Sequence, residues 1–213
     1  MTRAQWYFDF ISPYAYLQML RLPQMSDVCE LELQPILLAA VLNHWGQLGP
    51  AEIAPKRLFT YTQVRWLARR EEIALRIPEA HPFNPLKLLR LAIHLGGRYV
   101  VVKRLFEFVW RDGFIPENDA AWTELTSELG VADAAEAIAR DEIKRALKAN
   151  TDAAIAAGVF GVPTIAVDGQ LFWGNDATGM ARDYLNDPTS FASDAALIAR
   201  LPVAAQRRRR PAK

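Results

Sequence analysis

Ser12 stands where an apolar, strand-like run gives way to a helix-like pattern. The stretch Q-W-Y-F-D-F-I-S-P-Y-A-Y-L spans residues 5 to 17, and Pro13 follows the serine directly. Serine is a preferred helix N-cap and proline a preferred first helical residue, so a helix is predicted to begin here. The N–H groups of a helix start are unpaired and partly positive, which favours anions. The Ser12 hydroxyl can donate a hydrogen bond to a thiolate that a ligand brings in.

Two interpretations of Ser12 stay open on this stretch alone. The hydroxyl could serve only as an N-cap, or it could also stabilise a bound thiolate, and the two roles are compatible. The sulfur would have to come from a ligand, because no cysteine lies near Ser12 in the sequence. Asp9, in the preceding strand, is either a buried carboxylate bonded near Ser12 or an edge residue, and we favour a structural role.

A second candidate segment is G-V-F-G-V-P-T, residues 158 to 164. Gly158 and Gly161 permit left-handed backbone, and Pro163 can begin a strand because its missing N–H is tolerated there. A cis peptide bond between Val162 and Pro163 would expose the Val162 backbone for pairing with an extended ligand. This segment is therefore a second possible ligand contact.

The remaining reactive side chains favour structural roles. The three histidines, His44, His81 and His94, show no pair at a spacing such as H-x-x-x-H, so we expect no metal site. Cys29, the single cysteine, excludes an intramolecular disulfide and a C-x-x-C redox pair, and it fits a small buried strand residue. Most tryptophans are expected in the core, although Trp45 could also form a wall of an aromatic pocket.

The composition indicates a soluble globular protein. Of 213 residues, 51% are hydrophobic and 23% charged, and the net charge of +1 gives no reason to expect nucleic acid as a partner. We find no signal peptide and no apolar run long enough to span a membrane. With one cysteine, the chain suits a reducing compartment, and we expect a cytoplasmic location.

The apolar pattern predicts an order of elements that should position these residues. Strands are expected at residues 5 to 11 and Cys29–Leu38, with a helix after Pro13, which makes the two strands parallel. Residues 40 to 157 are predicted to be helical. One helix near Pro55 should carry Leu58, Tyr61, Val64 and Leu67 on one face. Others should run from Pro85 to Gly96-Gly97, over 99 to 109, around 119 to 129 and over 132 to 157.

The pattern returns to strands near residue 164. The stretch T-I-A-V-D-G-Q-L-F-W, residues 164 to 173, predicts a hairpin turning at Asp168-Gly169, and a helix should follow Asp176. The order is that of an α/β thioredoxin-like domain, at residues 1–38 and 158–200, with a large all-helical insertion at 39–157. Residues 201–213, which include four consecutive arginines, are expected to form a solvated tail. In such a fold Ser12 stands where the reactive cysteine is found, and a cysteine's thiol is acidified there.

Several motifs together resemble the 2-hydroxychromene-2-carboxylate isomerases, relatives of the kappa-class glutathione transferases. They are W-Y-F-D-F-I-S-P-Y-A-Y-L, P-K-R-L-F, H-P-F-N-P-L-K-L-L-R-L and G-V-F-G-V-P-T-I-A-V-D-G-Q-L-F-W-G-N-D, in order over roughly residues 5 to 186. The resemblance implies glutathione as cofactor, a homodimer, and a role in aromatic compound catabolism. It also implies a cis Val162–Pro163 bond, with the Val162 N–H and C=O binding the glutathione backbone.

The resemblance implies further roles for individual residues. Ser12 matches the serine that faces the glutathione sulfur, Lys56 a lysine near the glycine carboxylate, and Asn175 and Asp176 the segment that receives the γ-glutamyl group. The substrate pocket is expected to include Trp45, Gln47, His81 and Asn84. Two positions depart from the family pattern: Ala177 replaces an arginine, and Gln47 stands where kappa-class relatives tend to have asparagine.

The expected activity is cis/trans isomerisation of an aromatic 2-oxo acid. Reversible thiolate addition would make a conjugated double bond temporarily single, so that it could rotate. One alternative is a kappa-type glutathione transferase or peroxidase, in which the adduct is released. Another is a non-catalytic thioredoxin-like binding protein. A disulfide oxidoreductase is excluded at Ser12 because the cysteine is missing.

Overall fold

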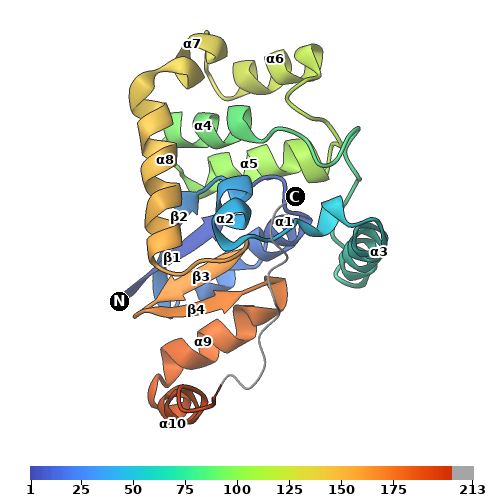
Figure 1. The fold of residues 1–213 in the computed structure, drawn as a ribbon. Helices are drawn as coiled ribbons and strands as arrows, with labels where there is room; N and C mark the ends of the chain where they lie inside the picture. The colour runs from blue at the N-terminus through green and yellow to red at the C-terminus, as the bar shows by residue number, and fades with distance from the viewer. Residues whose placement is uncertain (203–213) are drawn as a thin grey trace, which may run out of the picture.

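A four-stranded mixed sheet with the order β2-β1-β3-β4 lies at the centre of the structure (Figure 1). The computed structural model describes residues 1–202, so most of the predicted tail, residues 203–213, lies outside the described part. The parallel pair predicted from the strand–helix–strand pattern is confirmed, and β3 pairs with β1 in the antiparallel direction. The strands are β1 (Thr2–Phe8), β2 (Cys29–Pro35), β3 (Thr164–Val167) and β4 (Gln170–Trp173).

Both N-terminal strands differ in extent from the prediction. β1 ends at Phe8, three residues earlier than predicted, because the backbone turns back on itself. The Ser12 N–H donates to the Asp9 carbonyl at 3.1 Å, which closes this turn. The apolar residues after Phe8 thus belong to a loop. β2 likewise ends at Pro35, since the next helix begins at Leu38.

The β3–β4 hairpin forms as predicted. Asp168 and Gly169 have φ angles of 51° and 77°, the left-handed pair that a two-residue turn of this kind needs. The turn aligns Thr164 with Trp173. It therefore places the start of β3 beside the end of β4, where the candidate residues 162, 163, 175 and 176 lie.

Helices form the rest of the described chain, most of them between β2 and β3. Figure 1 shows α4 to α7 gathered on one side of the sheet, whereas α9 and α10 lie beyond β4. Within residues 1–202, no helix has the length and apolar character needed to cross a membrane. The helices are α1 (Pro13–Met19), η1 (Leu22–Met25), α2 (Leu38–Trp45), η2 (Pro50–Glu52), α3 (Ala54–Arg70), α4 (Leu86–His94), α5 (Tyr99–Trp110), α6 (Asp119–Glu128), α7 (Ala134–Ala139), α8 (Asp141–Ala156), η3 (Asn175–Ala177), α9 (Thr178–Asn186) and α10 (Thr189–Ile198).

Helix α3 begins at Ala54, with Pro55 in its first turn as predicted, and Val64 of the expected face is fully buried. Its buried residues are Thr60, Val64 and Ala68, which follow one another at intervals of one turn. Leu58, expected on the buried face, is 71% exposed. The predicted face is thus wrong at Leu58 only, since Tyr61 and Leu67 are half-buried. Apolar residues occur on several sides of this helix, so their spacing alone could not place each of them.

One apolar core connects the sheet with the inserted helices. Trp6 and Phe8 of β1 stack with ring centroids 4.6 Å apart, and both are fully buried. Phe106 of α5 packs against this pair and against Phe10, at 4.6 Å from the Phe10 ring. Cys29 is also buried, as predicted. The loop that leads from β1 to Ser12 therefore rests on the inserted helices.

Candidate functional site

Ser12 caps helix α1. Its Oγ accepts the Ala15 N–H at 3.2 Å, and Pro13 occupies the first turn. The side chain is nearly buried. Within residues 1–202 the hydroxyl accepts this one bond and donates none, so its proton is free for a ligand. Both interpretations made from the sequence are thus compatible with the geometry.

The loop before Ser12 is held by a buried carboxylate. Asp9 is fully buried, and its two oxygens accept the N–H groups of Ile11 at 3.1 Å and Leu38 at 2.9 Å. The preference for a structural role is supported, because the carboxylate ties the end of β1 to the start of α2. Burial raises the pKa of the Asp9 carboxyl to about 7, although the backbone hydrogen bonds oppose this shift.

The raised pKa of Asp9 makes folding stability depend on pH. A carboxyl whose pKa is higher in the folded than in the unfolded protein stabilises the fold while protonated, and this contribution is lost as the pH rises toward the folded pKa. From about pH 5 to about pH 7.5, we expect Asp9 to lower the free energy of unfolding by about 2 to 3 kcal/mol. Urea denaturation of the wild type and of Asp9→Asn measures this. The free energy of unfolding of the variant should lack this part of the pH dependence. Parallel plots of unfolding free energy against pH for the two proteins would contradict the prediction.

The Val162–Pro163 peptide bond is cis, as the sequence resemblance implied. The β1–β3 register pairs Tyr7 with Thr164, so Pro163 and Val162 continue toward the end of β1 and the loop that carries Ser12. The Pro163 carbonyl accepts the Gly174 N–H at 2.9 Å. In the described part of the chain, the Val162 N–H and C=O have no hydrogen-bond partner. They are available to an extended ligand.

Asn175 and Asp176 lie in the short helix η3, and their surroundings differ. Asn175 is buried, and its side-chain carbonyl accepts a hydrogen bond from Arg21 at 3.1 Å. Arg21 also forms an ion pair with Glu71 at the end of α3. Asp176 is exposed and borders a hollow of about 500 Å³. Burial and the Asp176 charge raise the pKa of the Tyr14 hydroxyl. Helix η3, which carries Asp176, contacts α1.

Lys56 and its neighbours lie on the exposed side of α3. Within residues 1–202, Lys56 and Arg57 form no ion pair. Sequence reasoning missed Arg57, although it stands directly beside Lys56 in P-K-R. Burial lowers the pKa of His81, and the Arg57 charge lowers it further. His81 itself lies against the loop before Ser12, through the Ile11 carbonyl.

His81 has a protein partner at each ring nitrogen. Nε2 lies 2.8 Å from the Ile11 carbonyl oxygen, and Nδ1 lies 2.7 Å from the Tyr61 hydroxyl. Tyr61 was expected only as part of an apolar helix face, so its polar role was missed. Asn84, by contrast, accepts the Leu86 N–H at 3.0 Å and serves the start of α4.

Aromatic side chains surround the segment before the cis peptide. Trp45 donates its indole N–H to the Val159 carbonyl at 2.9 Å and remains 42% exposed. Phe160 and Trp173 meet edge to face, with centroids 5.2 Å apart. Gly161 leaves room for this arrangement, because a Cβ at this position would lie 2.6 Å from the Trp173 indole nitrogen. Gln47 is exposed beyond the end of α2.

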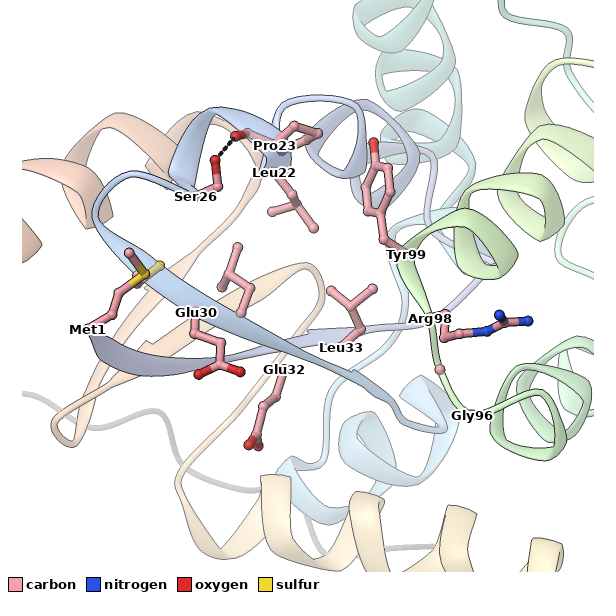
Figure 2. Close-up of a pocket in the computed structure, with 13 residues that line it drawn as sticks. Met1, Leu22, Pro23, Ser26, Glu30, Glu32, Leu33, Gly96, Arg98 and Tyr99 are labelled. Carbon is pink, nitrogen blue, oxygen red and sulfur yellow. Dashed lines mark hydrogen bonds between the residues drawn. The ribbon is translucent and has the colours of Figure 1, made fainter.

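A wider hollow lies away from these residues, along the free edge of β2. It measures about 770 Å³ and runs from β2 to residues 96–99. Figure 2 shows Leu22, Leu33 and Tyr99 around it. None of the candidate glutathione residues lines this hollow. This hollow is therefore separate from the residues expected to bind glutathione.

Comparisons with known proteins show the family of this chain. The model of the DSBA-like thioredoxin domain matches residues 5–186. A 2-hydroxychromene-2-carboxylate isomerase from Sphingobium xenophagum is 30% identical over 199 residues, covering 88% of this chain and 100% of the relative. A glutathione S-transferase kappa 2 from Caenorhabditis elegans is 25% identical over 214 residues, with coverages of 86% and 92%.

A solved structure supports the fold independently. The structure of a 2-hydroxychromene-2-carboxylate isomerase superposes with a TM-score of 0.75 at 23% identity, over 91% of this chain and 98% of that chain. The predicted thioredoxin-like fold and the resemblance noted in the sequence are thereby confirmed. The chain belongs to the DSBA-like thioredoxin domain family and, within it, to the 2-hydroxychromene-2-carboxylate isomerase enzymes.

Proposed function

We propose that this enzyme is a glutathione-dependent cis/trans isomerase of an aromatic 2-oxo acid. One observation carries the proposal: the Ser12 hydroxyl proton is free, and the unpaired backbone groups of Val162 lie at the strand end that leads to the same loop. A tripeptide could pair with Val162 and direct its sulfur toward Ser12. The protein has no cysteine of its own at this position, so the residues present fit a thiol cofactor.

When bound, glutathione would supply a thiolate that adds to the conjugated double bond and leaves again after rotation. The residues of the chain hold this cofactor and favour its ionised form. Ser12 would donate a hydrogen bond to the sulfur, and such bonds to charged acceptors are stronger than neutral ones. Lys56 would attract the glycine carboxylate as a point charge, and Asp176 would receive the γ-glutamyl ammonium. The Asn175 side-chain carbonyl accepts a hydrogen bond from Arg21, and its amide N–H groups are left for the ligand.

We place the aromatic part of the substrate beside Trp45, with Gln47, His81 and Asn84 as further candidates. The exposed aromatic rings next to the cis peptide support an apolar, planar ligand. We also propose a homodimer in the cytoplasm. Leu58, Phe59 and Trp66 are exposed on α3, and a second copy could cover them.

Product analysis tests the proposed reaction. Incubation with an aromatic 2-oxo acid that has a conjugated double bond should give the isomerised acid, with the amount of glutathione unchanged at the end. The reason is that each addition is followed by elimination, which regenerates the thiol. Omission of glutathione should abolish the isomerisation. If glutathione is consumed and a conjugate accumulates, the enzyme is a transferase.

The kappa-type transferase is the second candidate, favoured by the 25% identity to a kappa-class protein. It would use the same residues and differ in the fate of the adduct. A non-catalytic binding protein is a third candidate, and calorimetry addresses it. If glutathione does not bind, this third candidate is preferred over both enzymes.

A further inference from the structure

The carbonyl of Ile11, immediately before Ser12, is held by His81. The Nε2–O distance is 2.8 Å, and a carbonyl oxygen can only accept, so Nε2 must carry the hydrogen. In a neutral imidazole Nδ1 is then an acceptor, and the Tyr61 hydroxyl at 2.7 Å must donate to it. Burial of His81 and the nearby Arg57 charge favour this neutral form. Tyr61 thus selects the tautomer that can hold Ile11.

The imidazole ring is itself kept in place by aromatic neighbours. It meets Trp110 edge to face, with centroids 5.3 Å apart, and Phe83 at 6.2 Å. The fully buried Trp110 donates its indole N–H to the Phe10 carbonyl at 2.8 Å. Two side chains of the inserted helical region therefore hold two consecutive carbonyls of the loop that presents Ser12.

These two hydrogen bonds, from His81 to the Ile11 carbonyl and from Trp110 to the Phe10 carbonyl, form a clamp that affects the position of Ser12. The peptide group between Ile11 and Ser12 contains the Ile11 carbonyl, held by His81, and the Ser12 N–H, bonded to Asp9 at 3.1 Å. A peptide group is planar, so fixing both of its ends fixes the Ser12 Cα, and the hydrogen bond from the Ala15 N–H then holds the side chain. Releasing the carbonyl would let this peptide rotate and carry the Ser12 hydroxyl with it.

We propose that His81 is a positioning residue: the Tyr61–His81 pair holds the Ile11 carbonyl and thereby sets the Ser12 hydroxyl for the glutathione sulfur. The proposal deepens the proposed function and rests on it. For His81 it replaces the direct substrate contact proposed above by a role through Ser12, because both ring nitrogens are occupied. Tyr61 acts one step further away, by fixing the tautomer.

The first experiment needs no glutathione. Nitrogen NMR of the ligand-free protein should show His81 as the Nε2–H tautomer, and Tyr61→Phe should give a mixture of tautomers because Nδ1 loses its donor. Amide hydrogen exchange at Ser12 should be about tenfold faster in His81→Leu than in the wild type. His81→Gln should restore slow exchange, since its amide N–H can reach the Ile11 carbonyl. An Nδ1–H tautomer in the wild type, or equal exchange in the leucine and glutamine variants, would overturn the clamp.

The second experiment measures the bound thiol. In His81→Leu we expect the pKa of bound glutathione to rise by about one unit and kcat to fall about tenfold or more, with KM for glutathione changed much less. His81→Gln should recover most of both losses, and Tyr61→Phe should show a smaller loss while its fold is unchanged. A thiol titration identical in all four proteins would refute positioning of Ser12. If the wild type does not bind glutathione, the proposed function is wrong, and so is the proposed role of Ser12 toward the glutathione sulfur. The tautomer and hydrogen-exchange results would still show whether His81 holds the Ile11 carbonyl.

Discussion

Replacement of Ser12 by alanine is expected to lower the isomerisation rate by about a hundredfold to a thousandfold, the usual loss when one donor to a developing or bound anion is removed. The hydroxyl has a free proton in the described structure, and its only bond is the one it accepts from Ala15. A hydrogen bond to a charged acceptor contributes about 1.5 to 3 kcal/mol, so the pKa of bound glutathione should rise by about one to two units. Ultraviolet titration of the thiolate and steady-state kinetics measure the two effects.

The control for Ser12 must separate chemistry from helix capping. Asp133 caps α7 by accepting the Glu136 N–H at 2.8 Å, far from the site in the sequence. Loss of either cap should cost about 1 kcal/mol of stability. Asp133→Ala should therefore match Ser12→Ala in thermal stability while its kinetics and thiol titration stay those of the wild type. If the thiol titration of Ser12→Ala is unchanged too, Ser12 is only a cap.

The features that could be predicted from the sequence are those that short segments encode. Ser12-Pro13 starts a helix because the serine side chain accepts a backbone N–H of the first turn and proline suits the first helical position. Asp168-Gly169 forms a turn because both residues tolerate positive φ. The family motifs make the whole fold predictable, because they occur along the chain in the same order as in the family. The length of β1 escaped prediction, because whether residues 9–11 continue a strand depends on partners that are distant in the chain.

The positioning contacts of the site could not be predicted for the same reason. His81 reaches Ile11 across 70 positions, and Trp110 reaches Phe10 across 100. Both side chains are amphipathic and suit either a core or a pocket, so composition does not distinguish the two. Asn175 is a related case, because its motif indicates a ligand contact but does not predict the hydrogen bond from Arg21, 154 positions away, to its side-chain carbonyl.

Phe106→Ala is expected to lower the free energy of unfolding by about 3 to 5 kcal/mol, the range for a large aromatic side chain removed from a packed core. Phe106 is fully buried in α5, and its ring lies within 4.6 to 6.4 Å of the rings of Trp6, Phe8, Phe10 and Tyr16. Those four belong to β1, its following loop and α1. The cavity would thus open between the inserted helices and the strand that leads to Ser12.

The same variant tests whether the sheet and the inserted helices unfold together. Because one core joins them, we expect circular dichroism and tryptophan fluorescence to report coincident urea transitions in the wild type and in Phe106→Ala. Val100→Ala is the matched control, since Val100 is 66% exposed on the same helix and its loss should change stability by less than about 0.5 kcal/mol. Two separate transitions would mean that the insertion folds independently. The clamp on the Ile11 and Phe10 carbonyls would then be only as stable as the contact between two domains, and Ser12 could lose its position before the sheet unfolds.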